Sequence, residues 1–268
     1  MIDLKEKLSV LYFDGTSYED ISEVLAQFKD ELEKEVVLDV DKHIYIGFHK
    51  PIKNFYMQVS TPNETASEIF FEACLDESWE IISAVDETFN LTKSGFISFD
   101  NDLPEVCNIN NLSLFWFRVS SDDEMLFTLS TISMLLSSIN DLSAIYPPVA
   151  DEHFLLGKKS LHVAMELVKN DIVQELRNKP IKLEDYRRLT VFDLLDIQEL
   201  RQAASYKTVA HVLRNSFNTV DDKFYILSQD FFKKARELLD LYFLTVDFKG
   251  DGSAEVQKPS SNVQELLR

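Results

Sequence analysis

Asp247, Asp251 and Gly252 come closer to a metal site than any other arrangement in the sequence. A calcium loop of the EF-hand type needs oxygen ligands at positions 1, 3, 5 and 12 and a glycine at position 6. If Asp247 is position 1, Asp251 and Gly252 fall at positions 5 and 6, but Lys249 and Lys258 fall at positions 3 and 12. Two cations where oxygen ligands are required argue against calcium binding, and we predict a turn that ends a helix.

The histidines and the short catalytic motifs do not indicate an active site. His153 and His162 are about two and a half turns apart on one predicted helix, so they cannot share an ion. The other three, His43, His49 and His211, are scattered along the chain. Nucleophile-elbow, phosphate-loop, dinucleotide-binding and zinc-protease motifs are all missing from the sequence. We therefore predict that the protein is not an enzyme and has no catalytic, cofactor-binding or metal-binding residues.

The two tryptophans, Trp79 and Trp116, are the residues best suited to bind a sugar. An indole ring offers a broad apolar face and one hydrogen-bond donor, so a pair of them can form a stacking platform. The alternative is that one or both belong to the core or to an interface, and we prefer it. Arg187-Arg188 is a lone basic pair, which fits a solvated turn or an anchor between subunits better than a DNA site.

Cys74 and Cys107 are the only cysteines. Both could lie on neighbouring strands and form a disulfide, but two buried, reduced thiols are expected instead. Behind Met1 there is no apolar run of the kind found in a signal peptide, and no segment reaches the roughly 20 apolar residues of a membrane span.

The net charge of −19 is unevenly distributed. Residues 1–150 contain 9 Lys and Arg against 27 Asp and Glu, whereas residues 151–268 contain 18 against 19. An acidic surface repels nucleic-acid phosphates and anionic lipids, so we expect neither a membrane nor sequence-specific nucleic acid as a partner. The acidic face is either simply solvated or meets a basic partner.

Residues 1–147 are predicted to form an acidic antiparallel β-sandwich, because aromatic and β-branched segments alternate with turn residues. The predicted strands cover 8–13, 36–40, 44–49, 55–60, 68–73, 79–85, 95–99 and 113–120. Residues 18–35 fit either an amphipathic helix capped by Ser17 or a polar excursion between strands, and the helix is preferred.

The strand 113–120 shows the clearest alternation. Phe115, Phe117 and Val119 share one face and are expected in the core. Arg118 shares the other face with Trp116, and we expect that face to be the outer or partner-facing side.

From about residue 148 the apolar residues repeat with the period of a helix. Pro147-Pro148 marks the boundary, because proline cannot lie inside a helix. Three helices, beginning near residues 151, 193 and 222, predict a helical bundle over 148–250. Residues 251–268 are expected to be an extended tail. The predicted fold class is therefore α+β with two domains.

Within residues 44–120, Asp86-Glu-Thr88 is followed by Gly95-Phe-Ile-Ser-Phe99 and by Leu114-Phe-Trp-Phe-Arg118. This order resembles a β-sandwich module of structural proteins from tailed bacteriophages, which carries Asp-x-Thr, a Gly-x-Ile-Ser-Phe strand and Leu-Tyr-Trp-Ile-Arg. Here Phe115 and Phe117 replace the usual Tyr and Ile, and residues 71–78 lack the family's Gly and Trp. The resemblance implies a fold and a virion setting, without an active site.

The helical half, with Leu194-Leu-Asp196, Glu199-Leu-Arg201 and Asp222-Lys-Phe-Tyr225, resembles subunits of phage head–tail connector rings. This resemblance implies a neck adaptor that forms a homo-oligomeric ring and has portal, neck and tail proteins as partners. Such a protein would assemble in the host cytoplasm and function in the virion. Its acidic module would face outward or line a channel for DNA.

The leading hypothesis is thus a non-catalytic connector or adaptor subunit. The alternative is a tail or baseplate module whose β-sandwich binds host-surface carbohydrate. The candidate interface residues are Trp116, Arg118, Arg187, Arg188, Leu266, Leu267 and Arg268.

Overall fold

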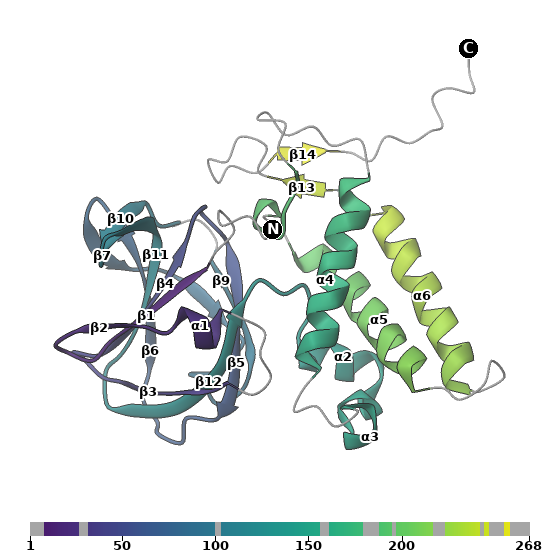
Figure 1. Cartoon of the computed structure of the whole chain (residues 1–268), viewed down its shortest axis with the longest axis horizontal. Coiled ribbons are helices and arrows are strands. Elements are labelled where there is room, and N and C mark those ends of the chain that lie inside the picture. Colours follow the sequence, from purple (N-terminus) through teal and green to yellow (C-terminus); the bar gives the residue numbers. More distant parts are fainter. Residues whose placement is uncertain are drawn as a thin grey trace, which may run out of the picture. The chain divides into compact units, whose positions relative to one another are not determined.

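A computed structural model of the 268-residue chain shows an α+β protein with two antiparallel sheets and several helices (Figure 1). The structure describes residues 8–26, 32–99, 103–155, 161–178, 188–194, 197–216, 223–241, 244–246 and 255–257. The chain divides into two compact units, which are Met1–Ser138 with Lys158–Val163 and Ile139–Gly157 with Ala164–Arg268. We call them the sheet unit and the helical unit. The division after Ser138 precedes the predicted boundary at 147, because the apolar segment Ile139–Ile145 forms a helix that packs in the helical unit.

The larger sheet has seven strands in the order β2-β1-β4-β11-β6-β7, and β10 also pairs with β11. Its strands are β1 (Ser9–Phe13), β2 (Tyr18–Asp20), β4 (His43–Phe48), β6 (Ile69–Leu75), β7 (Ser78–Ile81), β10 (Val106–Ile109) and β11 (Leu112–Ser121). β11 is long enough to serve two partners on one edge: Leu112–Phe115 pairs with β10, and Phe117–Ser121 pairs with β6.

The second sheet has the order β3-β12-β5-β9-β8. Its strands are β3 (Lys34–Leu38), β5 (Asn54–Thr61), β8 (Ala84–Asp86), β9 (Gly95–Phe99) and β12 (Met125–Ser133). No strand is predicted from the sequence at β10 or β12. In β12, Thr128, Ser130 and Thr131 interrupt the apolar residues, so the segment does not match the aromatic and β-branched pattern used for the other strands.

The core of the sheet unit is aromatic and lies between the two sheets. Phe117 of β11 stacks on Phe99 of β9 with ring centroids 4.4 Å apart, and Phe55 of β5 is 5.8 Å from Phe117. Each such ring contributes about 1.5–3 kcal/mol when it is fully buried. Phe117 and Val119 are fully buried, as their alternation predicted, whereas Phe115 is only partly buried.

The predicted helix over residues 18–35 is wrong in the described part of this segment. Tyr18–Asp20 instead pairs with β1 as β2, and the only helix there is α1 (Ser22–Leu25). The Ser22 hydroxyl accepts a hydrogen bond from the Val10 amide at 2.8 Å, which ties the segment to β1. Strand pairing therefore overrode the helical spacing, and the alternative of an excursion between strands is closer to the structure.

The helical unit contains α2 (Ile139–Ile145), α3 (Glu152–Leu155), α4 (His162–Arg177), α5 (Gln198–Asn215) and α6 (Lys223–Leu241), with 3₁₀ turns at Pro147–Ala150 and Val191–Asp193. The single long helix expected after Asp151 is thus replaced by α3 and α4, which are separate. α5 packs against α6, with Tyr206 and Phe231 at 5.7 Å, and α2 is joined to α5 by an ion pair between Asp141 and Arg201 at 2.9 Å. Among the described helices, none has both the length and the apolar character that a bilayer crossing demands.

Two short strands lie near the C-terminus. β13 (Leu244–Val246) falls within the range predicted as a helical bundle, and β14 (Glu255–Gln257) falls within the predicted tail. They pair antiparallel, so residues 255–257 of the predicted tail are extended and bound to the same chain.

Candidate functional site

The outer face of the seven-stranded sheet carries a second apolar cluster, separate from the core between the sheets. Strand alternation brings these residues to one side, because they are cross-strand partners or alternate neighbours on β1, β4, β7, β10 and β11. We call this group the outer-face cluster. Its members are the buried Leu11, Tyr45, Ile109 and Trp116 and the partly buried Phe13, Trp79, Cys107 and Leu114.

Trp116 lies at the bottom of this cluster and is fully buried. Its indole N–H donates to the Leu112 carbonyl at 3.3 Å, and its ring lies against Gly47, where an added Cβ would come within 2.6 Å of a ring carbon. Trp116 is therefore a packing residue. This agrees with the preferred interpretation that one or both tryptophans are core residues. The face that Trp116 shares with Arg118 is the outer one, as expected, but other side chains cover Trp116 there.

Cys74 and Cys107 form a disulfide, with Cα atoms 6.4 Å apart. The expectation of two reduced thiols is therefore wrong. β6 and β10 lie end to end along the same edge of β11, and this places the two cysteines on adjacent strand ends. The Glu105 amide also donates to the Cys74 carbonyl at 2.8 Å, so the strand ends are joined by a hydrogen bond as well as by the disulfide.

The disulfide joins two hairpins with the same kind of turn. Asp76 and Glu77 connect β6 to β7, and Asn110 and Asn111 connect β10 to β11. All four residues have positive φ, between 47° and 65°, as type I′ turns require. Asn tolerates positive φ better than most residues do, whereas glutamate rarely adopts it, so the backbone at Glu77 is in an uncommon conformation.

Between the two hairpins is a hollow of about 430 Å³, which we call the β-hairpin hollow. It is within the size range of small-ligand sites. Its lining combines an aromatic ring, an amide, a hydroxyl, a carboxylate and the disulfide. The lining residues are Cys74, Glu77, Trp79, Val106, Cys107, Asn108, Ile109 and Ser113.

The ring of Trp79 is in contact with two neighbouring side chains of the sheet unit. The Tyr45 ring meets it edge-on with centroids 5.4 Å apart, and the Arg118 guanidinium carbon lies 4.9 Å from its centroid. In the described structure, the Trp79 indole N–H makes no hydrogen bond. The residue thus contributes an aromatic ring to the lining of the hollow.

Arg118 is in turn fixed by Glu72. Its Nε donates to Glu72 Oε2 at 2.7 Å and its second nitrogen donates to Oε1, so the pair is bidentate. Ser120 adds a hydrogen bond to the same carboxylate at 3.0 Å. Burial alone would lower the pKa of Arg118, but the hydrogen bond and charge of Glu72 outweigh it and raise the pKa. Arg118 therefore supports Trp79, and its charge is already compensated.

The remaining predicted interface residues lie in the helical unit or outside the described residues. Arg188 is exposed at the start of a described segment in the helical unit. Arg187, Leu266, Leu267 and Arg268 lie outside the described residues. Trp116 and Arg118 lie on the same face of β11, and neither lines the β-hairpin hollow.

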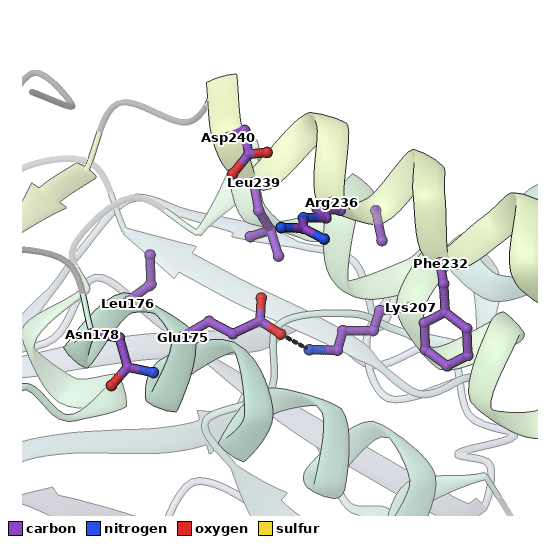
Figure 2. Close-up of a pocket in the computed structure, with 9 residues that line it drawn as sticks. Glu175, Leu176, Asn178, Lys207, Phe232, Arg236, Leu239 and Asp240 are labelled. Carbon is purple, nitrogen blue, oxygen red and sulfur yellow. Dashed lines mark hydrogen bonds and ion pairs between the residues drawn. The ribbon is translucent and has the colours of Figure 1, made fainter. Parts of the chain in front are cut away.

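A second hollow, of about 510 Å³, lies within the helical unit and is lined from α4, α5 and α6 (Figure 2). We call it the helical hollow. Lys207 of α5 faces Glu175 of α4 across its floor, with Nζ 2.5 Å from Oε1, and Phe232 and Leu239 enter from α6. Arg236 and Asp240 complete a lining in which two cations match two anions. Because the charges balance, the lining favours neither an anionic nor a cationic ligand, and the helical hollow does not indicate a class of ligand.

No group of three or more His, Cys, Asp or Glu side chains within the described ranges could hold a metal ion. The two histidines with shifted pKa values lie in different units. Burial lowers the pKa of His43 in the sheet unit and that of His211 in the helical unit. Both therefore favour the neutral form.

Comparisons with known proteins are uninformative for this chain. No protein-family model and no curated protein sequence matches it. Among solved structures, a chitosan-binding module of a chitosanase/glucanase from Paenibacillus sp. IK-5 is 12% identical to this chain, with a TM-score of 0.32. The matched region covers 48% of this chain and 94% of the module. The module CBM32-1 from a family 31 glycoside hydrolase of Clostridium perfringens is 11% identical, with a TM-score of 0.31. Here the matched region covers 49% of this chain and 96% of the module. Likenesses this distant support no conclusion about fold or function.

The sequence contained part of the information that locates the β-hairpin hollow. Asn110-Asn111 between two short apolar segments is a hairpin signature, and it would have revealed β10. Cys107 comes next to Cys74 because β6 pairs with the same edge of β11 as β10 does, and the sequence pattern does not show that pairing. Nothing in the sequence pattern distinguishes the partly exposed Trp79 from the buried Trp116.

Proposed function

We propose that the sheet unit is a β-sandwich that binds carbohydrate at the β-hairpin hollow, without catalysis. The observation that supports this most directly is Trp79, whose ring borders a hollow also lined by Asn108, Ser113 and Glu77. Of the two functions considered from the sequence, this is the alternative, with Trp79 as the only one of the two tryptophans that lines the hollow.

The chemistry of the lining suits a sugar ring. A pyranose has an apolar face of C–H groups, which packs on an indole, and a rim of hydroxyls, which both donate and accept hydrogen bonds. Asn108 can do both, Ser113 can do both, and the Glu77 carboxylate accepts. Asn108 Nδ2 lies 3.3 Å from Ser113 Oγ, so these two polar groups already form a connected pair.

Preorganisation also supports the proposal. A ligand site loses affinity when its side chains must be ordered on binding. Here the disulfide joins the two hairpins, and the Tyr45 ring and the Arg118 guanidinium both contact the Trp79 ring. The ring therefore has little freedom to lose.

The test is glycan-array screening followed by calorimetry on the full chain. Trp79→Ala is expected to lower the affinity for any bound glycan at least tenfold. Phe89→Ala is the matched control, because Phe89 is also an exposed aromatic of the sheet unit but does not line the hollow. Near-ultraviolet circular dichroism and the melting temperature check the fold of both variants. If Trp79→Ala binds like the unmodified protein, or Phe89→Ala loses as much affinity, the proposal is wrong.

The connector function implied by the phage resemblance stays a prediction, as do the ring, the phage partners and the virion setting. The described residues offer no feature that bears on ring formation. Light scattering of the purified chain would measure the oligomeric state on which that hypothesis depends.

A further inference from the structure

The β-hairpin hollow has an acidic end. Glu77 is the only charged side chain among the described residues that line it, and Asp76 precedes it in the same turn. The Glu105 carboxylate accepts a hydrogen bond from the Asp76 amide at 3.4 Å, which places a third carboxylate at this turn. The chain therefore presents negative charge beside the ring of Trp79.

No cation among the described lining residues compensates this charge. The nearest guanidinium to Trp79 belongs to Arg118, and it is bound by both carboxylate oxygens of Glu72. The surroundings strengthen the imbalance, since residues 1–150 hold 9 basic side chains against 27 acidic ones. A ligand that enters the hollow consequently meets a negative potential.

We propose that the β-hairpin hollow prefers sugars that carry a free, protonated amino group, such as oligomers of glucosamine, over N-acetylated or acidic sugars. This inference rests on the carbohydrate-binding function proposed above. An ammonium group can donate a charge-assisted hydrogen bond to Glu77 and can lie on the face of an indole. A carboxylated sugar is repelled by the same groups.

The size of the preference follows from the exposure of Glu77. Ion pairs in contact with solvent contribute about 0.2–1 kcal/mol, which corresponds to a preference of up to about fivefold. Because the charge is exposed, salt should reduce the preference without abolishing the stacking on Trp79.

The experiment compares three oligosaccharides of equal length on the full chain at pH 6, by calorimetry. These are a glucosamine tetramer, its N-acetylated form and a galacturonate tetramer. We expect the glucosamine tetramer to bind about three- to fivefold more tightly than the acetylated form, and the galacturonate to bind most weakly. In 0.5 M salt the first ratio should fall below about twofold.

Two charge variants test whether Glu77 causes the preference for the amino sugar. Glu77→Gln is expected to bring the affinity ratio of the amino to the acetylated tetramer to about one, because the amide keeps an oxygen acceptor for sugar hydroxyls but loses the charge that attracts an ammonium group. Glu80→Gln is the matched control, because Glu80 is an exposed carboxylate on β7 that does not line the hollow, and it should keep the preference.

The outcomes separate this inference from the proposed function. Equal binding of the amino and acetylated tetramers, both lost in Trp79→Ala, would overturn the inference and support carbohydrate binding. A preference that survives in Glu77→Gln or in high salt would overturn the role of the acidic end. Failure of every glycan, on the array and in calorimetry, to bind would overturn both.

Discussion

Trp79 lies directly opposite Cys74 across the β6–β7 pair, and Cys74 is bonded through its sulfur to Cys107 on β10. The ring proposed to stack on sugar is therefore a cross-strand neighbour of the bond that joins the two hairpins. Any change to the disulfide should affect both the stability of the sheet unit and the geometry of the β-hairpin hollow.

Replacing both cysteines, as Cys74→Ser with Cys107→Ser, should lower the free energy of unfolding by about 3–4 kcal/mol. This value follows from the loop-closure entropy of a bridge that spans 33 residues. Urea titration of the full chain measures it, and we expect glycan affinity to fall as well. Treatment of the unmodified chain with a reductant should reproduce both changes and should leave the double variant unaffected. Stability unchanged by either treatment would contradict the disulfide.

The contact between Gly47 and Trp116 predicts a coupled pair of substitutions. Gly47→Ala places a methyl group 2.6 Å from a ring carbon of Trp116 and should destabilise by about 1–3 kcal/mol through overpacking. Trp116→Ala removes the largest fully buried side chain and should cost about 3–5 kcal/mol. In a double-mutant cycle, Gly47→Ala should be much less harmful when Trp116 is replaced by Ala. Additive effects would show that the two residues do not touch.

The pair Glu72–Arg118 should be important for stability, because the exposed fractions of the two side chains are only 9% and 20%. Glu72→Ala leaves the Arg118 charge without its partner and is expected to destabilise by about 3 kcal/mol. Glu19→Ala is the control, since Glu19 is paired with Lys34 on the surface and should cost less than about 1 kcal/mol. Chemical denaturation of both variants tests this, and similar losses would contradict it.

Tyr45 predicts how stability depends on alkaline pH. Burial raises its pKa to about 12, and the neighbouring Tyr18 adds to the rise. Because the folded-state pKa is above the ordinary value of 10.0, this residue's stabilisation is complete below pH 10 and is lost as the pH rises towards 12. Urea unfolding between pH 9 and pH 11.5 should show a steeper loss in the unmodified protein than in Tyr45→Phe. Parallel curves would mean that Tyr45 ionises as readily in the folded state as in the unfolded one.

Local sequence patterns predicted several strands well, including buried ones. β9 was predicted at its observed limits, and β4, β5 and β11 to within a residue or two, because their aromatic and β-branched residues are bounded by turn residues. The pattern failed at β12, where Ser and Thr interrupt the apolar residues. It also failed at residues 18–35, where pairing with β1 replaced the expected helix.

The candidate site was harder to predict than the strands because it depends on which strands are neighbours. Alternation placed Arg118 and Trp116 on one face correctly, but an outer face can be covered, and Trp116 is buried there. The disulfide and the ion pair of Glu72 with Arg118 join residues 33 and 46 positions apart. Such pairings follow from strand order, which local periodicity does not contain.

The split pairing of β11 has a consequence for how this protein can change over evolution. Leu112–Leu114, the end next to the Asn110–Asn111 turn, pairs with β10 alone, whereas Phe117 and Val119 pair with β4 and β6 and fill the main core. The exposed positions of this hairpin tip can therefore be exchanged with little effect on the interior, provided that Cys107 and the buried Ile109 are kept. Under the proposed function, ligand preference should diverge faster than the architecture, and grafting this hairpin tip would be a direct way to engineer new specificities.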